Sequence, residues 1–401
     1  MKHIISIFIL LFLLTSCNKE SENPELIQSE DIVRTISVMV SDPGDSDGDL
    51  EGGDIFANSP DILNDDKFAE DKSKLYISQK GYTINPNFGK YVNDNLYTYI
   101  YNGNENATWN SGYNFKTTDS ENSISWRKIS ENGASSAGYT LFGMYFPEEN
   151  NLPETTNVFN VQTDQSTVEG LRKSNILGAF HATSSLYTPL RFRLFHLTVF
   201  LDVYVYIPVY NFEEEEGYTG FMQDAFQSAY AMSVNPNFTI DWSSIRPSDI
   251  YPPFVNLYGE EKKDIPLYLY RDENNYPIIE EKTIEIPNSY VGNIYEEGSF
   301  KEKVYVYHFS VLFPPQGDSF PASNFLQFKF KTPGGSVKTY NFNGALQTAP
   351  GGNLGMTQGT YQQLNLYLSR YGADVVLVKA KVMPWIPAFT DMNIVKESDN
   401  Q

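Results

Sequence analysis

The sequence is poor in the residues on which thiol, redox and metal chemistry depends. Its 401 residues contain one cysteine, Cys17, and four histidines. A single cysteine excludes an internal disulfide. His181, His196 and His308 are far apart in the sequence, so the HExxH spacing of zinc hydrolases does not occur. The sequence therefore predicts no metal site and no cofactor.

Positive charge is also scarce. The chain has 29 lysines and arginines against 50 aspartates and glutamates, which gives a net charge of −21. This balance repels nucleic-acid phosphates, so we expect no nucleic-acid partner. The sequence has no GxSxG nucleophile elbow and no GxxxxGK[ST] phosphate loop, and we expect no enzymatic activity. A hydrolase with two catalytic carboxylates stays a remote third reading, since many acidic residues are present and no pair stands out.

Long segments with helical periodicity are almost absent. Short runs that alternate apolar and polar residues dominate, and they are bounded by Gly, Pro, Asn and Asp, which predicts strands. Aromatic residues, which favour β-structure, make up 15% of the chain. We interpret the weak helical pattern of residues 217–232 as a loop with at most two turns. The predicted strands are 35–40, 74–84, 95–103, 138–147, 195–207, 304–313 and a hairpin of 360–369 and 373–385.

The N-terminus has the features of a secretory signal. Lys2 precedes an apolar run from Ile4 to Leu14. This run is too short for a bilayer span, which needs about 20 residues, and it is typical of a signal peptide. "LTSC" at 14–17 resembles the lipobox of bacterial lipoproteins, whose cysteine is acylated and becomes the new N-terminus. The position of Cys17 favours a lipoprotein signal peptide (1–17) over an ordinary one, and hence an outer-membrane lipid anchor.

Four stretches resemble the fimbrillin-like lipoproteins of Bacteroidetes, which include the subunits of type V pili. They share an aromatic strand leading to a tryptophan, a strand ending in "YFP", a segment with a Phe-His strand, and a closing hairpin with a terminal tryptophan. The resemblance implies an all-β chain with two tandem transthyretin-like β-sandwich domains, 59–187 and 188–401. Residues 18–58 then form a tether, a first strand and an acidic connector. The four stretches are 95–109, 124–147, 174–209 and 359–385.

The resemblance also implies a mode of assembly. A trypsin-like protease cuts the precursor after an arginine and releases the first strand, and a strand of the next pilus subunit fills the groove. Arg34 is the candidate, because it is the first arginine after Cys17 and the next is Arg127. The alternative to processing is that Arg34 is an ordinary polar residue at a strand edge. The acidic residues after Cys17 resemble a signal for export to the cell surface.

Two functions stay open. The preferred one is a surface-anchored structural or adhesive pilus subunit that assembles by strand exchange. The alternative is a non-polymerising surface lipoprotein that binds a glycan or protein of a host or bacterial surface. Trp109 and Trp242 are candidate ligand contacts, whereas Trp385 is expected in the core. His196 is expected to be a hydrogen-bonded strand residue. A donor strand near the C-terminus is weakened by Pro387.

The stretch Asp42–Asp54, "DPGDSDGDLEGGD", raises the question of calcium binding. With Asp45 as the first ligand of an EF-hand loop, the glycine position holds Leu50 and the glutamate position holds Phe56. Both residues are wrong for that loop. Calcium binding through another loop geometry stays open, and the resemblance makes the stretch an acidic connector after the first strand.

Overall fold

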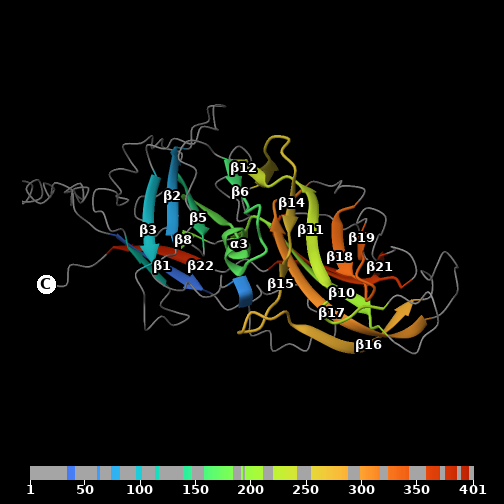
Figure 1. Ribbon diagram of the computed structural model, residues 1–401. Coiled ribbons are helices and arrows are strands. Elements are labelled where there is room, and N and C mark those ends of the chain that lie inside the picture. Colours follow the sequence, from blue (N-terminus) through green and yellow to red (C-terminus); the bar gives the residue numbers. More distant parts are fainter. Residues whose placement is uncertain are drawn as a thin grey trace, which may run out of the picture.

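The computed structural model describes residues 34–40, 61–63, 74–81, 96–101, 113–116, 139–146, 158–183, 191–192, 195–210, 220–241, 254–287, 299–316, 324–342, 358–370, 375–385 and 390–396. Within these ranges nearly all regular structure is strand (Figure 1). The helical elements among them are α3 (Val168–Lys173) and the single 3-10 turn η1 (Asp61–Leu63). The prediction of an all-β chain is confirmed.

The N-terminal half contributes most of a nine-stranded sheet, in the order β8-β22-β1-β4-β3-β2-β5-β7-β9. The predicted strands near residues 35, 74, 95 and 138 are confirmed as β1, β2, β3 and β5. The C-terminal strand β22 lies beside β1, so red and blue strands are neighbours in Figure 1. The bounds are β1 (Arg34–Val40), β2 (Lys74–Gly81), β3 (Leu96–Tyr101), β4 (Tyr113–Lys116), β5 (Tyr139–Phe146), β7 (Leu177–Thr183), β8 (Arg191–Phe192), β9 (Phe195–His196) and β22 (Thr390–Lys396).

The other half pairs two sheets around one core. A six-stranded sheet has the order β15-β17-β10-β20-β21, with β16 also on β17, and a four-stranded sheet has the order β14-β11-β18-β19. Apolar side chains from both sheets meet in one buried cluster. The bounds are β10 (Val199–Pro208), β15 (Tyr268–Leu269), β16 (Ile279–Pro287), β17 (Ser299–Phe313), β20 (Thr360–Leu368), β21 (Val375–Pro384), β11 (Phe226–Val234), β14 (Lys263–Pro266), β18 (Leu326–Lys331) and β19 (Val337–Phe342).

The alternating pattern of β10 places its two faces as predicted. Every second residue from Val199 to Ile207 is buried in the core between the two sheets. The opposite face carries Phe200, Asp202 and two tyrosines. The predicted strand is nevertheless interrupted, because Phe195 and His196 form β9 in the nine-stranded sheet. Between them, the backbone of Leu197 and Thr198 bonds to Ile176 and Gly359, so the chain changes sheets here.

The prediction of a loop over 217–232 is wrong for its second part. β11 runs from Phe226 to Val234 and pairs with β14 on one side and β18 on the other. Its alanines have low strand propensity, yet Ala229 and Ala231 are buried in the core. Pairing on both sides and burial stabilise a strand that local propensity does not indicate.

The C-terminal hairpin is confirmed as β20 and β21, but one face of β21 differs from the prediction. Val376, Val378, Ala380 and Val382 were expected on one side, from strict alternation. A register shift makes Asn365 face Lys379 while Leu366 faces Leu377, which leaves Val378 as an extra residue. A bulge of this kind shifts the alternation by one. Consequently Leu377 and Ala380 pack on the main core, Val376 packs on the other face, and Val382 is 42% exposed.

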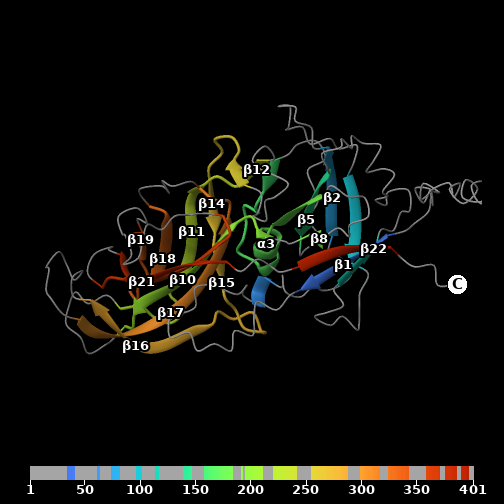
Figure 2. The same cartoon turned by 180° about the vertical axis from the view of Figure 1, so that it is seen from behind.

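A short segment joins the two halves. α3 lies between the nine-stranded and six-stranded sheets in both views (Figure 1, Figure 2). Just before it, the Gln165 amide donates to the carbonyl of Leu312 at 2.7 Å and accepts from its N–H at 2.8 Å, as a neighbouring strand would. A three-stranded sheet, β13 (Phe254–Leu257), β12 (Asn237–Asp241) and β6 (Val158–Asn160), also links the halves. Strand pairing crosses the expected domain boundary at 187/188, since β8, β9 and β22 belong to the nine-stranded sheet. The boundary and the transthyretin-like type of the domains stay predictions.

Candidate functional site

The terminal strands β1 and β22 are each other's principal partners. They pair antiparallel over seven residue pairs, from Arg34 opposite Lys396 to Val40 opposite Thr390. On its other side β1 has three pairs with β4. On its other side β22 has two pairs with β8. A strand forms at the C-terminus despite Pro387, because these partners supply its hydrogen bonds.

Arg34 is the first residue of β1. It directly precedes the strand predicted over 35–40, and the structure extends that strand by one residue to include it. Its role in processing stays a prediction. The peptide bond after Arg34 joins two residues whose partners on β22 are Lys396 and Val395, so a protease requires local opening of this pairing.

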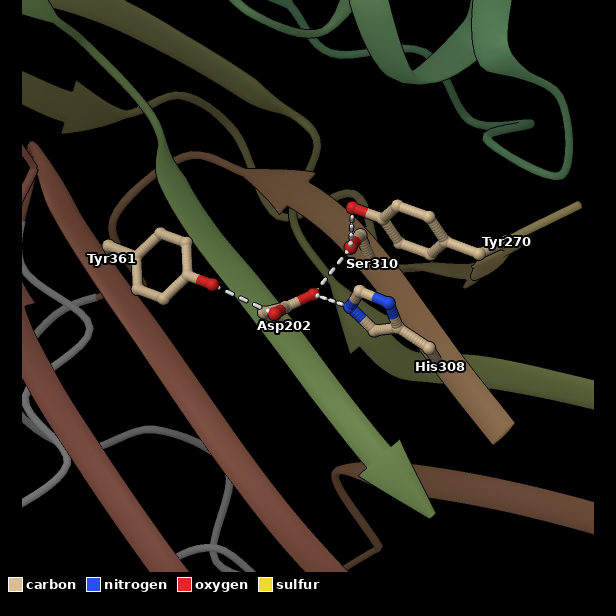
Figure 3. Close-up of polar contacts among 5 residues, drawn as sticks. All are labelled: Asp202, Tyr270, His308, Ser310 and Tyr361. Atoms are coloured by element: carbon tan, nitrogen blue, oxygen red, sulfur yellow. Dashed lines mark hydrogen bonds and ion pairs between the residues drawn. The ribbon is translucent and has the colours of Figure 1, made fainter. Parts of the chain in front are cut away.

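A second group of interest is a buried polar cluster on the outer face of the six-stranded sheet (Figure 3). Asp202 of β10 is 2% exposed. Its Oδ1 accepts from His308 Nε2 at 2.5 Å and from Ser310 Oγ at 2.8 Å. Its Oδ2 accepts from the hydroxyl of Tyr361 at 2.8 Å. Three hydrogen bonds from two neighbouring strands, β17 and β20, thus reach one carboxylate, and they compensate the charge that burial would otherwise make costly.

Aromatic rings enclose this cluster. His308 lies between Tyr204 and Tyr270, at ring centroid distances of 4.2 Å and 3.7 Å, and the planes differ by 10° and 4°. Ser310 has one hydroxyl proton, which goes to Asp202, so the 3.1 Å contact makes the Tyr270 hydroxyl the donor to Ser310 Oγ. Tyrosine rings thus cover both faces of the His308 ring.

Burial and the charge of Asp202 act on the tyrosines of the cluster. Burial, followed by Asp202, raises the pKa of Tyr204 to about 12. The same two causes raise the pKa of Tyr270 and of Tyr361 still further. The phenols therefore stay protonated and remain donors at physiological pH.

The cluster contains the residue types of a hydrolytic triad in a different arrangement. In a triad the histidine lies between serine and carboxylate, and it accepts the serine proton. Here both Ser310 and His308 bond to the same oxygen of Asp202, and no bond joins them to each other. The geometry fits a structural network that ties together β10, β17 and β20.

Removing the acceptor of this network is expected to be costly. Asp202→Ala leaves three donors without their acceptor, so we expect a loss of roughly 2–4 kcal/mol in the free energy of unfolding. Asp202→Asn keeps the shape and one acceptor oxygen, so the loss should be smaller. Urea denaturation followed by tyrosine fluorescence measures both. The control, Glu260→Ala at an exposed position, is expected to change stability by less than about 0.5 kcal/mol; equal effects of Asp202→Ala and the control would contradict this account.

The buried tyrosines predict a loss of stability in alkali. Their pKa values are raised in the folded protein, so above the ordinary value of about 10 the unfolded chain loses phenol protons that the folded chain retains. Stability is therefore fully present below pH 10 and falls as pH rises toward about 12. The melting temperature, measured across this range, should fall more gently for Tyr340→Phe, because burial alone raises the pKa of Tyr340. Tyr276→Phe, at a 70% exposed position, is the control and should follow the parent curve.

A buried ion pair lies on the same face of the sheet. Arg370 Nε donates to Glu302 Oε2 at 2.8 Å, and Arg370 Nη2 contacts Oε1. Both side chains are 7% exposed. The hydroxyl of Tyr367 lies 3.4 Å from Oε2. The pair joins the end of β20 to β17, and its charges are compensated within the protein.

His196 and Trp385 are confirmed as packed residues. The two rings stack at 3.5 Å with planes 4° apart, and His196 Nδ1 lies 2.9 Å from Asn175 Oδ1. Trp385 is 3% exposed. Cys17, Trp109, Trp242 and the acidic stretch 42–54 lie outside the described residues, so their roles stay predictions.

Among the residues that the structure describes, no group of three or more His, Cys, Asp or Glu side chains is placed to hold a metal ion. In the same part of the chain, no helix has the length and apolar character needed to cross a membrane.

The sequence pattern did not predict the Asp202 cluster. The signal was present, because a charged residue interrupts the aromatic face of an otherwise apolar strand, "VFLDVYVYI". Its partners, however, come from residues 106 and 159 positions away. Alternation indicates the face on which Asp202 lies and says nothing of what lies opposite.

No protein-family model and no curated protein matches the chain. Similar solved structures include a candidate cell adhesion protein from Bacteroides uniformis, with 12% identity over 88% of this chain and 99% of that chain and a TM-score of 0.44. The tip fimbrial protein Mfa3 from Porphyromonas gingivalis has 10% identity over 80% and 96%, with a TM-score of 0.31. A fimbrial assembly protein from Parabacteroides distasonis has 9% identity over 79% and 93%, also with a TM-score of 0.31. Similarity at these identities and TM-scores does not assign a function to this chain.

Proposed function

We propose that this protein is a surface-anchored, fimbrillin-like pilus subunit with a structural or adhesive role and no catalytic activity. The observation that carries the proposal is the pairing of β1 with β22 over seven residue pairs. The two ends of the described chain thus meet as neighbouring strands of one sheet. Subunits that exchange strands need a terminal strand and a strand edge that accepts it.

Strand exchange is favourable here for a physical reason. A strand delivered by another subunit makes the same backbone hydrogen bonds as the chain's own strand, so little bonding energy is lost. An uncovered β1 edge would expose backbone donors and acceptors and would pair unspecifically. Exchange covers that edge and joins subunits in the same step.

The sequence supplies the anchoring part of the proposal. Lipidation of Cys17 would hold the subunit at the outer membrane, with the two transthyretin-like domains at the cell surface. Processing after Arg34 would release it from the lipid. Its partners are then other pilus subunits, the outer membrane through the anchor, and a ligand on a host or bacterial surface.

Limited trypsin treatment of the purified chain tests polymerisation. We expect SDS-resistant ladders, and N-terminal sequencing of the ladder bands is expected to start at Thr35 if Arg34 is the processing site. Arg34→Gln is the matched variant for the cleavage site, and its ladder bands should not start at Thr35. A protein that stays monomeric under all conditions would contradict a polymerising subunit.

A second function, a non-polymerising binding lipoprotein, is favoured by one surface feature. Tyr276 is 70% exposed on a turn fixed by Asp272, whose Oδ1 accepts from the backbone N–H of Asn274 and Tyr276 at 3.0 Å and 2.8 Å. An exposed ring on a fixed turn is suited to stacking on a ligand. A stable monomer that binds a glycan array, and loses binding with Tyr276→Ala, Trp109→Ala or Trp242→Ala, would support this alternative.

A further inference from the structure

The outer face of the four-stranded sheet differs in charge from the rest of this acidic chain. Three of its strands, β11, β18 and β19, contain no aspartate or glutamate, although the chain has 50 acidic residues against 29 basic ones. The fourth strand, β14, contributes Asp264 at the sheet edge, where its Oδ1 accepts from the backbone N–H of Ser233 at 2.9 Å. The face therefore offers a local surface that does not repel anions.

Strand register arranges the outward side chains of this face in rows (Figure 1). The residues between them, among them Phe328, Phe330 and Tyr340, are buried in the core, so the rows point away from it. Lys331 follows two residues after the second row. With strands about 4.8 Å apart and alternate residues about 7 Å apart, the patch measures roughly 10 Å by 14 Å. The two complete rows are Tyr230–Gln327–Asn341 and Ser228–Lys329–Thr339.

The lysines of this patch lack the partners that other lysines have. Elsewhere in the described chain, four lysines each form an ion pair with a glutamate: Lys173, Lys263, Lys282 and Lys303. Within the same part of the chain, neither Lys329 nor Lys331 has a carboxylate in ion-pair range. Their ammonium groups are thus available to an anionic ligand.

The polar and aromatic side chains beside them are also suited to a ligand. Gln327 Nε2 donates to Asn341 Oδ1 at 3.0 Å, which orients both amides and leaves the Gln327 carbonyl and the Asn341 NH₂ for further bonds. Tyr230 is half-buried, and among the described residues no aromatic ring stacks on it, unlike Tyr204 and Tyr270. A tyrosine held in this way presents an apolar ring and a polar tip together.

We propose that this face binds an extended glycan that carries carboxylates, of the uronic-acid class. A sugar ring can pack on Tyr230, its hydroxyls can bond to the amides and hydroxyls of the rows, and its carboxylates can pair with the two lysines. An acidic protein segment would use the lysines alone, so the composition of the patch favours a glycan. This inference rests on the adhesive role within the proposed function and names its ligand class and its site.

Calorimetric titration with tetragalacturonate tests the inference on the purified chain from Asn18 onward, which keeps every described residue. We expect a dissociation constant of roughly sub-millimolar order. The fully methyl-esterified tetrasaccharide has the same sugar chain without the charge, and it should bind at least about tenfold more weakly. A synthetic peptide of residues 42–54, which is acidic and contains no sugar, should bind more weakly as well.

Variants locate the binding on the sheet. Lys329→Gln combined with Lys331→Gln should lower the affinity for tetragalacturonate at least about tenfold, because both charge-assisted contacts are lost. Tyr230→Ala should lower it about fivefold or more. The matched control, Lys282→Gln combined with Lys303→Gln, removes the same charge from exposed positions on β16 and β17 and should stay within about twofold of the parent. Melting temperatures show that each variant is folded.

The outcomes separate this inference from the proposed function. Tetragalacturonate binding that both patch variants lose and the control keeps supports the inference. No binding, or binding that the patch variants leave unchanged, overturns it. Equal binding of the peptide, lost in the same variants, also overturns it, because the face would then recognise negative charge and not a glycan. No substituted residue lies in β1 or β22, so trypsin ladders without tetragalacturonate binding leave the pilus-subunit function standing.

Discussion

A chain that ends at Pro387 is expected to bind a synthetic peptide of residues 388–401, and the complete chain is expected to bind it much more weakly. The truncation removes β22 and leaves one edge of β1 without a partner. Backbone groups on an open edge form hydrogen bonds with an added strand of the correct register. Fluorescence polarisation of the labelled peptide measures the binding, for which we expect a dissociation constant of roughly micromolar order.

Proline substitutions in the peptide test whether the binding is strand pairing. Ile394→Pro removes a backbone donor at the position opposite Ile36, and it should weaken binding by at least about tenfold, since proline is excluded from paired strands. Ser398→Pro lies beyond the end of β22 and is the matched control. Equal binding of the two peptides would show that the peptide does not pair with β1 as a strand.

The second large effect is expected from Arg370→Met. This substitution leaves Glu302 buried without its cation, and breaking a buried ion pair from one side costs about 3–5 kcal/mol. Glu302→Met in combination with Arg370→Met removes both charges and should recover much of the loss, because no unpaired charge remains. Urea denaturation of the two single variants and the double variant gives the coupling between the residues.

An exposed ion pair on the neighbouring strands is the control for that cycle. Lys303 Nζ lies 2.5 Å from Glu281 Oε1, and the two side chains are 59% and 44% exposed. Lys303→Met should change stability far less than Arg370→Met does, because solvent screens exposed pairs. If Arg370→Met behaves like Lys303→Met, Glu302 does not depend on Arg370 in the way the structure indicates.

The face of a strand was predictable wherever alternation is uninterrupted. Every second residue from Val199 to Ile207 and from Leu364 to Leu368 points into the core, as the pattern indicates. Alternation fails where one residue is inserted, as at Val378 of β21. It also fails where small residues form a strand through their neighbours, as in β11. In both places the sequence pattern describes only the strand itself, whereas hydrogen bonds to other strands decide its conformation.

The candidate sites, too, were partly predictable from the sequence and partly decided by the tertiary structure. The sequence by itself determined the all-β class, the alternation of most strands, the position of a single cysteine in a stretch that resembles a lipobox, and an arginine directly before the first predicted strand. The tertiary structure alone decided that β22 pairs with β1, that Phe195 and Val199 belong to different sheets, and that Asp202 is surrounded by His308, Ser310 and Tyr361. A strand's pattern is set by the residues within it, but its partner is set by which distant segments bury each other's surface and satisfy each other's backbone.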